Sequence, residues 1–426
     1  MAANANIDLE NYDPMDYEVQ QCPFDHYAAL REQGPLFFHK QSETFIASRI
    51  DVVNQILRDT ETFSSEQSNA KTRSDDLETQ REVDEILAKG WPKADTMLTI
   101  DPPYQTRYRK LISKTFSARR IGAYEAKVRE IAIDLIKDFP SRGSINFSEV
   151  FATPLPIKAI HHILNMAPEV ENKIKWWSDA SINTLGANPS REKRLETAES
   201  IVDCQMYWFS EYEDRIMNPQ DDILSELAHA DFDDPDLHEG ETRKLDFPEV
   251  YGIMRQLMVA GNETTTKFLN ETMRLLIENP EWWEELERNS DGISYGIVEE
   301  GLRTSSPTQG LFRTVTKDTE VEGTSVPKGS RVWVVFAAAN RDEREFSSPE
   351  EFLPDRENAN KHLAFGKGHH FCIGAPLSRL EGKVAFEELG KRIKLPSFNV
   401  KNTFEYEPSY VVRGLSALHI DVEKKT

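Results

Sequence analysis

The segment Phe365-Gly366-Lys367-Gly368-His369-His370-Phe371-Cys372-Ile373-Gly374 places one cysteine in a loop between glycines. Glycine permits tight turns and the close approach of a flat partner. The following residues, 375–389, have a helical pattern, and a thiolate near a helix N-terminus is stabilised by free N–H groups and by the positive end of the helix dipole. We therefore expect Cys372 to have a lowered pKa and to act as an anion.

A lone cysteine in such a loop limits the kinds of site that this loop can form. A nucleophilic cysteine requires a base and an orienting group, and a zinc site requires several ligands. No second cysteine is nearby, although His369 and His370 are. An axial bond to haem iron requires only one thiolate, which Cys372 alone supplies.

Upstream of this loop, the sequence predicts one long helix. Asp246 is an N-cap with Glu249 three residues later and proline in the first turn, and nothing ends the pattern before Pro280. The helix then has about 30 residues and a length of about 45 Å, enough to cross a domain. Its middle, 260–266, contains glycine, several threonines and a glutamate, which are unfavourable in a buried helix and therefore suggest function.

The rest of the chain indicates a mainly α fold with a smaller β-rich part, in one domain over residues 1–426. From Val315 onward the pattern changes to short strands and turns, and the apolar run Val332 to Ala339 is typical of a buried strand. Further helices are expected at 51–58, 117–139, 192–217 and 297–303, and a short strand at 45–47.

Composition limits the partners and the location. The 426 residues carry a net charge of −22, which argues against nucleic acid or an anionic membrane as the main partner. The N-terminal residues lack the features of a signal peptide or membrane anchor, and three cysteines are too few for a disulfide framework. We expect a soluble cytoplasmic protein. The acidic stretch 226–241 is expected to be an exposed loop without chemistry.

From about Asp13 to its C-terminus, the sequence resembles the soluble bacterial cytochromes P450, which are haem-thiolate monooxygenases. The cysteine loop matches the family pattern Phe-Gly-x-Gly-x-His-x-Cys-x-Gly at every fixed position. The resemblance implies haem b as the cofactor and Cys372 as the axial ligand of its iron. It also implies that His370 contacts a haem propionate and that Phe365, Gly366 and Gly374 form the loop around the cofactor.

Other motifs support the same resemblance. Glu300 and Arg303 match the family's Glu-x-x-Arg pair, and Arg356 completes this ionic cluster, which implies folding and haem retention. Arg313 and Arg109 match arginines that bind the propionates. Gln105 stands where the family usually has a histidine, so we expect only a neutral hydrogen bond there.

The unusual middle of the long helix resembles the acid–alcohol pair of the family. A thiolate ligand favours O–O cleavage, which requires protons. Thr264 is expected to donate a proton or hold a water, and Glu263 to pass protons inward, while Gly261 lets the helix open beside the cofactor. By family position, the substrate pocket should be lined by Gln256, Val259, Ala260, Gln309, Leu311, Val411 and Val412.

These mostly apolar positions suggest a small or medium apolar substrate, such as a terpenoid, aromatic or alicyclic compound. The chain lacks a dinucleotide fingerprint and an iron–sulfur cysteine cluster, so electrons must come from a ferredoxin or flavodoxin with its reductase. A basic region is the expected docking site: Arg107, Arg109, Lys110, Lys114, Arg119, Arg120, Lys361, Lys367 and Arg379. The resembled family is usually monomeric.

Two alternatives are a haem-thiolate peroxygenase that uses hydrogen peroxide and a haem-based gas sensor. The pair Glu263 and Thr264 favours the O₂-dependent hydroxylase, because a peroxygenase needs no proton relay from solvent. A sensor would be expected to carry a regulatory or nucleic-acid-binding domain, and the sequence shows no such domain.

Overall fold

The computed structural model describes residues 7–66, 76–182, 189–238 and 240–425. Helices predominate, as the sequence predicts. They are α1 (Tyr17–Gln21), α2 (Phe24–Gln33), α3 (Ile50–Arg58), α4 (Leu77–Leu87), α5 (Tyr104–Ser113), α6 (Ala118–Gly122), α7 (Glu125–Lys137), α8 (Pro154–Ile163), α9 (Ile174–Ile182), α10 (Arg191–Met217), α11 (Ile223–His229), α12 (Phe247–Glu278), α13 (Pro280–Arg288), α14 (Ser290–Ser305), α15 (Phe336–Ala339) and α16 (Ala375–Arg392).

The strands form a five-stranded sheet of order β1-β2-β8-β5-β3, a three-stranded sheet of order β4-β10-β9 and the hairpin β6-β7. In the larger sheet, β2 and β8 run parallel and the other neighbours run antiparallel. The strands are β1 (Leu36–His39), β2 (Thr44–Ala47), β3 (Phe63–Ser64), β4 (Arg142–Asn146), β5 (Leu311–Val315), β6 (Thr319–Val321), β7 (Thr324–Val326), β8 (Arg331–Val334), β9 (Ser397–Phe398) and β10 (His419–Glu423).

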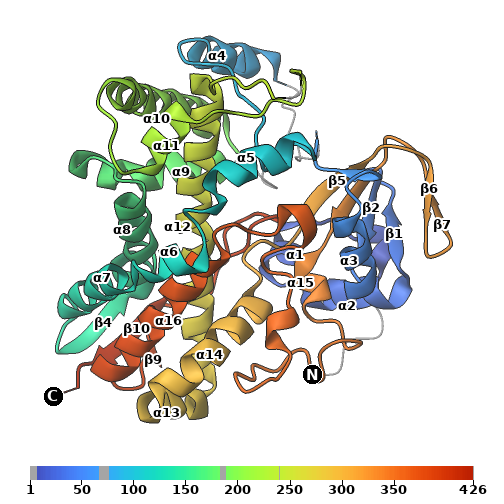
Figure 1. Cartoon of the computed structure of the whole chain (residues 1–426). Helices are drawn as coiled ribbons and strands as arrows, with labels where there is room; N and C mark the ends of the chain where they lie inside the picture. Colours follow the sequence, from blue (N-terminus) through green and yellow to red (C-terminus); the bar gives the residue numbers. More distant parts are fainter. Residues whose placement is uncertain (1–6, 67–75, 183–188, 239, 426) are drawn as a thin grey trace.

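Figure 1 shows the larger sheet on one side of the molecule and most of the helices on the other, with α12 running through the helical part. The predicted capping box of α12 is present, since Asp246 accepts from the N–H of Glu249 and the Glu249 carboxylate accepts from the N–H of Asp246. The helix packs against α8, α9, α10, α14 and α16. Within the described ranges, no helix combines the length and the apolar character needed to span a bilayer.

Three predicted segments differ from the structure: a helix and a strand, described first, and the acidic stretch, described after them. The helix expected over 117–139 is divided into α6 and α7 by a turn at residues 123–124. The strand expected over Val332 to Ala339 ends at Val334, after which the backbone forms α15. A continuous apolar run fits a buried strand and a buried helix equally well, so its pattern could not locate this change.

The acidic stretch 226–241 is not simply an exposed loop. Its first residues belong to α11, whose apolar side is buried. Further along, Phe232 and Arg243 form a β-bridge, and Asp234 accepts hydrogen bonds from Arg243 and from Tyr104 on α5. These contacts attach the acidic stretch to α5.

Candidate functional site

The cysteine loop precedes α16 and is shaped by two glycines in the left-handed region. Gly366 has a φ of +63° and Gly368 a φ of +72°, and a Cβ at Gly368 would lie 2.6 Å from the carbonyl oxygen of Leu57. The N–H of Cys372 donates to the carbonyl of Phe365 at 2.9 Å, which closes the loop. Gly374 is the N-cap of α16, so the sulfur lies at the N-terminus of that helix as predicted.

Burial raises the pKa of the Cys372 thiol, which corrects our expectation of a lowered pKa. The N–H groups of Gly374 and Ala375 and the nearby charges of Arg109 and Arg379 act in the opposite direction without reversing the effect of burial. Cationic metals convert a coordinating thiol to the thiolate. A bound iron would likewise favour the thiolate, so this environment fits axial ligation of iron.

Two guanidinium groups near the loop have no carboxylate within 4.0 Å among the described residues, those of Arg109 and Arg313. Arg313, on β5, is only 4% exposed, donates to the carbonyl of Phe312 at 2.7 Å, and has its pKa lowered by burial to about 10. A buried, uncompensated charge is unfavourable. A ligand with two carboxylates would satisfy both arginines, so the residues present fit haem b with its two propionates.

The residues around these arginines connect the loop to the β-rich part. Nε2 of His370 lies 3.0 Å from the hydroxyl of Ser65 and 3.8 Å from the carboxylate of Asp101, which also interacts with Arg313. The guanidinium of Arg379 lies over the ring of Phe365, 4.7 Å from its centroid.

Gln105 donates a neutral hydrogen bond to the cysteine loop. It is 1% exposed, and its amide nitrogen donates to the carbonyl of His369 at 2.7 Å. The amide therefore supports the cysteine loop, and its contact with a propionate stays a prediction. Arg109 donates to the same carbonyl at 3.4 Å.

One face of α12 is more exposed than the rest of the helix, and we call it the open face. Gln256, Ala260 and Thr264 are four residues apart and therefore share this face. Ala260 is exposed and Gln256, Val259 and Thr264 are half-buried, although most of the helix is buried. Next to Thr264, the hydroxyl of Thr265 donates to that of Ser378 on α16 at 3.5 Å, so this part of α12 lies close to the helix that follows Cys372.

The helix does not open at Gly261. The α-helical backbone is continuous through this segment, and the hydroxyl of Thr264 donates to the carbonyl of Ala260 at 3.0 Å. A Cβ at Gly261 would lie 3.1 Å from two carbons of Ile160 on α8. The glycine therefore permits close packing of α8 against α12, which is not the role that we expected.

Glu263 is 4% exposed and is held by two lysines. Its Oε1 accepts from Lys175 at 3.2 Å, and its Oε2 lies 3.8 Å from Nζ of Lys267. Burial raises the pKa of Glu263, and the two lysines offset part of this effect. Burial therefore favours the protonated form of this carboxyl group and the two lysines favour the charged form.

The predicted pocket residues do not all lie at an open surface. Gln309 is 1% exposed, accepts from the hydroxyl of Tyr27 at 3.2 Å and donates to the carbonyl of Ser306 at 2.6 Å. Val411 and Val412 are buried in the same apolar cluster as Tyr27. Gln309 and the two valines are thus part of the core, while Leu311 is half-buried. Family position could not reveal these local hydrogen bonds.

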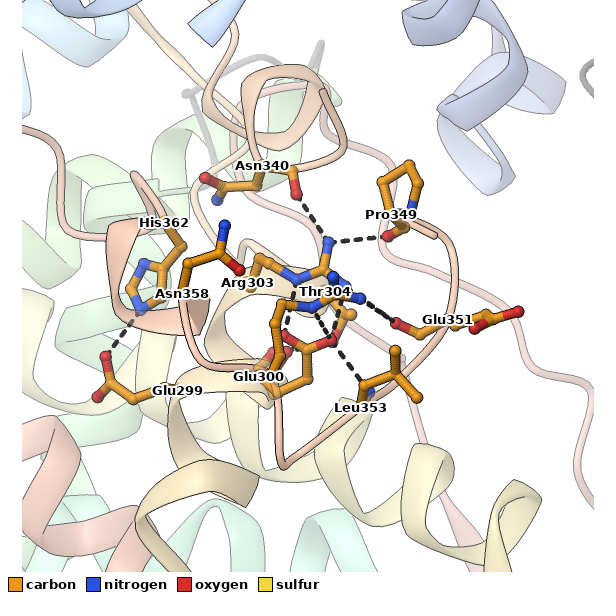
Figure 2. A network of polar contacts seen from close by, with 12 residues as sticks. Glu299, Glu300, Arg303, Thr304, Asn340, Pro349, Glu351, Leu353, Asn358 and His362 are labelled. Carbon is orange, nitrogen blue, oxygen red and sulfur yellow. Dashed lines mark hydrogen bonds and ion pairs between the residues drawn. The ribbon is translucent and has the colours of Figure 1, made fainter. Parts of the chain in front are cut away.

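The predicted ionic cluster is present (Figure 2). Glu300 and Arg303 are fully buried and form two hydrogen bonds, at 2.7 and 2.8 Å, while Arg356 donates to Glu300 at 3.0 Å. The remaining donors of Arg303 reach the carbonyls of Asn340, Pro349 and Glu351. The cluster therefore attaches α14 to the long C-terminal loop that leads to Cys372.

Sequence reasoning missed three charged residues on or beside α12, of which Lys267 and Glu381 are buried and Lys175 is half-buried. Lys175 on α9 and Lys267 on α12 contact Glu263. Glu381 on α16 is fully buried, and burial raises its pKa to about 8, against the opposing effect of the Thr265 hydroxyl. Glu381 has apolar residues one turn away on both sides, and this spacing was the available signal; Lys267 has polar and charged neighbours at that spacing, which gave none.

Several residues of the expected docking region are paired within the protein. Arg107 contacts Asp233, Arg120 contacts Asp221 and Glu226, Lys361 contacts Glu345, and Arg379 contacts Glu299. Among the described residues, ion pairs do not involve the other five members, which are Arg109, Lys110, Lys114, Arg119 and Lys367. The ring of Phe371 beside them is 38% exposed.

Comparisons with known proteins agree with this geometry. The family model described as Cytochrome P450 matches residues 190–401. A putative cytochrome P450 of Bacillus subtilis (strain 168) is 31% identical over 86% of each chain. The linalool 8-monooxygenase of Pseudomonas putida is 28% identical over 91% of this chain and 92% of its own. The crystal structure of CYP109E1 from Bacillus megaterium in complex with testosterone is 30% identical, covers 95% of this chain and 99% of its own, and has a TM-score of 0.80.

Proposed function

The chain belongs to the cytochrome P450 family and is a haem-dependent monooxygenase, and from this premise we propose that it hydroxylates a small or medium apolar molecule with O₂ and electrons from a ferredoxin-type partner. The observation that carries the proposal is the position of Thr264. It lies on the open face of α12, next to Thr265, which contacts α16 shortly after Cys372.

The residues that would hold the cofactor are Cys372 at the iron and Arg109 and Arg313 at the propionates. When bound, haem b supplies the iron at which dioxygen is reduced before one oxygen atom enters the substrate. The protein contributes the protons. Glu263 holds a proton in the interior, and the hydroxyl of Thr264, now bonded to the carbonyl of Ala260, can rotate to donate toward the open face or to hold a water there.

The substitution Thr264→Ala tests this assignment. It removes the hydroxyl but keeps the helix, so the enzyme should still consume electrons while product per electron falls by at least about tenfold. The measurement compares consumed reductant, product and released peroxide. Thr266→Ala, two residues further along the same helix, is the control and should leave this ratio unchanged. Unaltered coupling in Thr264→Ala would instead favour a peroxide-driven reaction.

The hydrogen bonding of Gln256 favours a substrate that has a hydroxyl group on an apolar skeleton. Its amide nitrogen donates to Thr96 at 2.7 Å, whereas its buried Oε1 has no hydrogen-bond partner among the described residues. Rotation of the Gln256 amide would expose this oxygen to a donor on the substrate, whereas Gln309 is already saturated. The proposed class is a terpenoid or alicyclic alcohol of moderate size.

Spectral titration of the ferric protein with pairs of alicyclic compounds tests the role of Gln256. We expect the alcohol of each pair to bind about tenfold more tightly than its hydrocarbon, corresponding to one hydrogen bond. Gln256→Leu should remove this preference and retain the hydrocarbon affinity. Equal affinities for both members in the unsubstituted protein would contradict the proposal.

The basic residues without ion pairs around the cysteine loop support an acidic electron donor. Lys110 on α5, Lys114 at the C-cap of that helix and Lys367 in the loop give local positive charge in a protein of net charge −22. Association with an acidic ferredoxin should therefore slow as salt is raised. Lys114→Glu should lower the association rate, and an unchanged rate and salt dependence would argue against this surface.

A further inference from the structure

The two lysines that hold Glu263 reach it from different parts of the protein. Lys175 belongs to α9 and contacts Oε1, whereas Lys267 is one turn further along α12 and faces Oε2. Lys175 also pairs with Asp179, and Lys267 also pairs with Glu407. Each carboxyl oxygen of Glu263 thus faces one lysine, and each of these lysines is also paired with a second carboxylate.

Lys267 is more deeply buried and more closely packed than Lys175. The side chain of Lys267 is 4% exposed, compared with 41% for Lys175. The N–H of Glu407 donates to the carbonyl of Gly414 at 3.0 Å, which closes the loop above Lys267. A Cβ at Gly414 would lie 2.2 Å from Cγ of Lys267, so only glycine leaves room for the lysine stem.

We propose that Lys267 is a positioning residue for Glu263 and that Glu407 regulates it by competing for the same ammonium group. This inference rests on the proposed function, because it concerns the residue that supplies protons to Thr264. It assigns the 407–414 loop a role in catalysis although this loop does not contribute the acid itself.

The competition follows from the distances. The ammonium of Lys267 is hydrogen-bonded to Glu407, whereas it lies 3.8 Å from Oε2 of Glu263, beyond hydrogen-bond distance. A buried lysine needs a counter-ion, and Lys267 shares its charge between two carboxylates. When Glu407 holds the ammonium, Glu263 has weaker restraint on Oε2 and is freer to turn toward the open face.

Four charged groups face Glu263 from the elements packed against it, and their signs give the prediction. Lys175 and Lys267 lower the pKa of Glu263, whereas Asp179 and Glu407 raise it, on top of the increase that burial causes. Removing the Lys267 charge should raise the pKa further. Removing the Glu407 charge should lower it, because one anion is lost and Lys267 becomes available to Glu263 alone.

The test compares Lys267→Met and Glu407→Gln in the full-length holoenzyme. Difference infrared spectroscopy follows the carboxyl group of Glu263 against pH, with Glu263→Gln identifying its band. The midpoint should move to higher pH in Lys267→Met and to lower pH in Glu407→Gln. The acid limb of product formed per electron should move in the same two directions. Lys267→Arg keeps the charge and should restore the midpoint of the unsubstituted protein.

Glu405→Gln is the matched control, because Glu405 lies two residues before Glu407, accepts from the hydroxyl of Tyr17 at 2.8 Å and is not among the groups that act on Glu263. It should leave the midpoint unchanged. Unmoved midpoints in both variants, or shifts in the same direction, would overturn the proposal. Should Lys267→Met fail to fold, Glu407→Gln decides alone. Failure of the proposed function itself would appear separately, as absence of O₂-dependent product in the unsubstituted enzyme.

Discussion

Arg313 is the residue of the site whose charge is least compensated by the protein itself. It is buried on β5, and the Coulombic effect of Asp101 does not offset the cost of burial, so its pKa falls to about 10. Such a buried positive charge is unfavourable unless an anionic group binds to it. A cofactor carboxylate at this position would turn a destabilising residue into a binding one.

The substitution Arg313→Leu should therefore have opposite effects on the two forms of the protein. The apoprotein should be as stable as before or more stable in urea, because an uncompensated buried charge is removed. Haem should be lost to an acceptor protein about 10 to 100 times faster, since a charge-assisted hydrogen bond disappears.

Arg288→Leu, which alters an arginine whose side chain is 77% exposed, is the control and should change neither quantity. A clear loss of apoprotein stability together with unchanged haem retention in Arg313→Leu would show that this arginine has a structural partner instead.

At the scale of elements, α12, α14 and α16 approach one another through glycines. A Cβ at Gly301 would lie 2.4 Å from Oγ1 of Thr272, and one at Gly382 would lie 2.6 Å from the ring of Phe268. Both neighbours belong to α12. The two glycines thus set the distances at which α14, which carries Glu300 and Arg303 of the ionic cluster, and α16, which follows Cys372, pack against α12.

Gly382→Ala should lower the free energy of unfolding by about 1–3 kcal/mol, because Phe268 is buried and has to shift. Gly122→Ala offers a comparison within α6, since nothing lies within 4 Å of its Cβ position. That substitution should stabilise the protein by about 0.4–1 kcal/mol through the unfolded state. Urea unfolding of both variants measures the difference, and equal effects of the two substitutions would contradict this packing account.

The predictable elements were those with strong local signals. The Asp246 capping box and the proline after Asn279 bracket α12, and its observed bounds agree with them. Gly122 stands directly before the turn between α6 and α7, but an isolated glycine can also lie inside a helix, and the change from β8 to α15 lies inside one apolar run. The local pattern is ambiguous at both places, and tertiary packing decides the structure there.

At the scale of the whole molecule, the site lies where the helical part meets the β-rich part. Cys372 precedes α16, Thr264 lies on α12, Arg109 on α5 and Arg313 on β5. The shape of the cysteine loop could be predicted, because its motif is contiguous. The pocket could not, since Gln309 and its neighbours pack against Tyr27 from the opposite end of the chain. The roles of Lys175 and Lys267 could not be predicted for a similar reason, because Lys175 contacts Glu263 from another helix and Lys267 contacts Glu407, which is 140 residues away.

The central claim is a bond between the sulfur of Cys372 and haem iron, and the absorption spectrum of the reduced protein under carbon monoxide tests it most directly. We predict the strongly red-shifted band of a thiolate-ligated haem in the unsubstituted protein and its loss in Cys372→Ser. A reduced, carbon-monoxide-bound protein without that band, or a Cys372→Ser variant that retains both the band and product formation, would contradict the account.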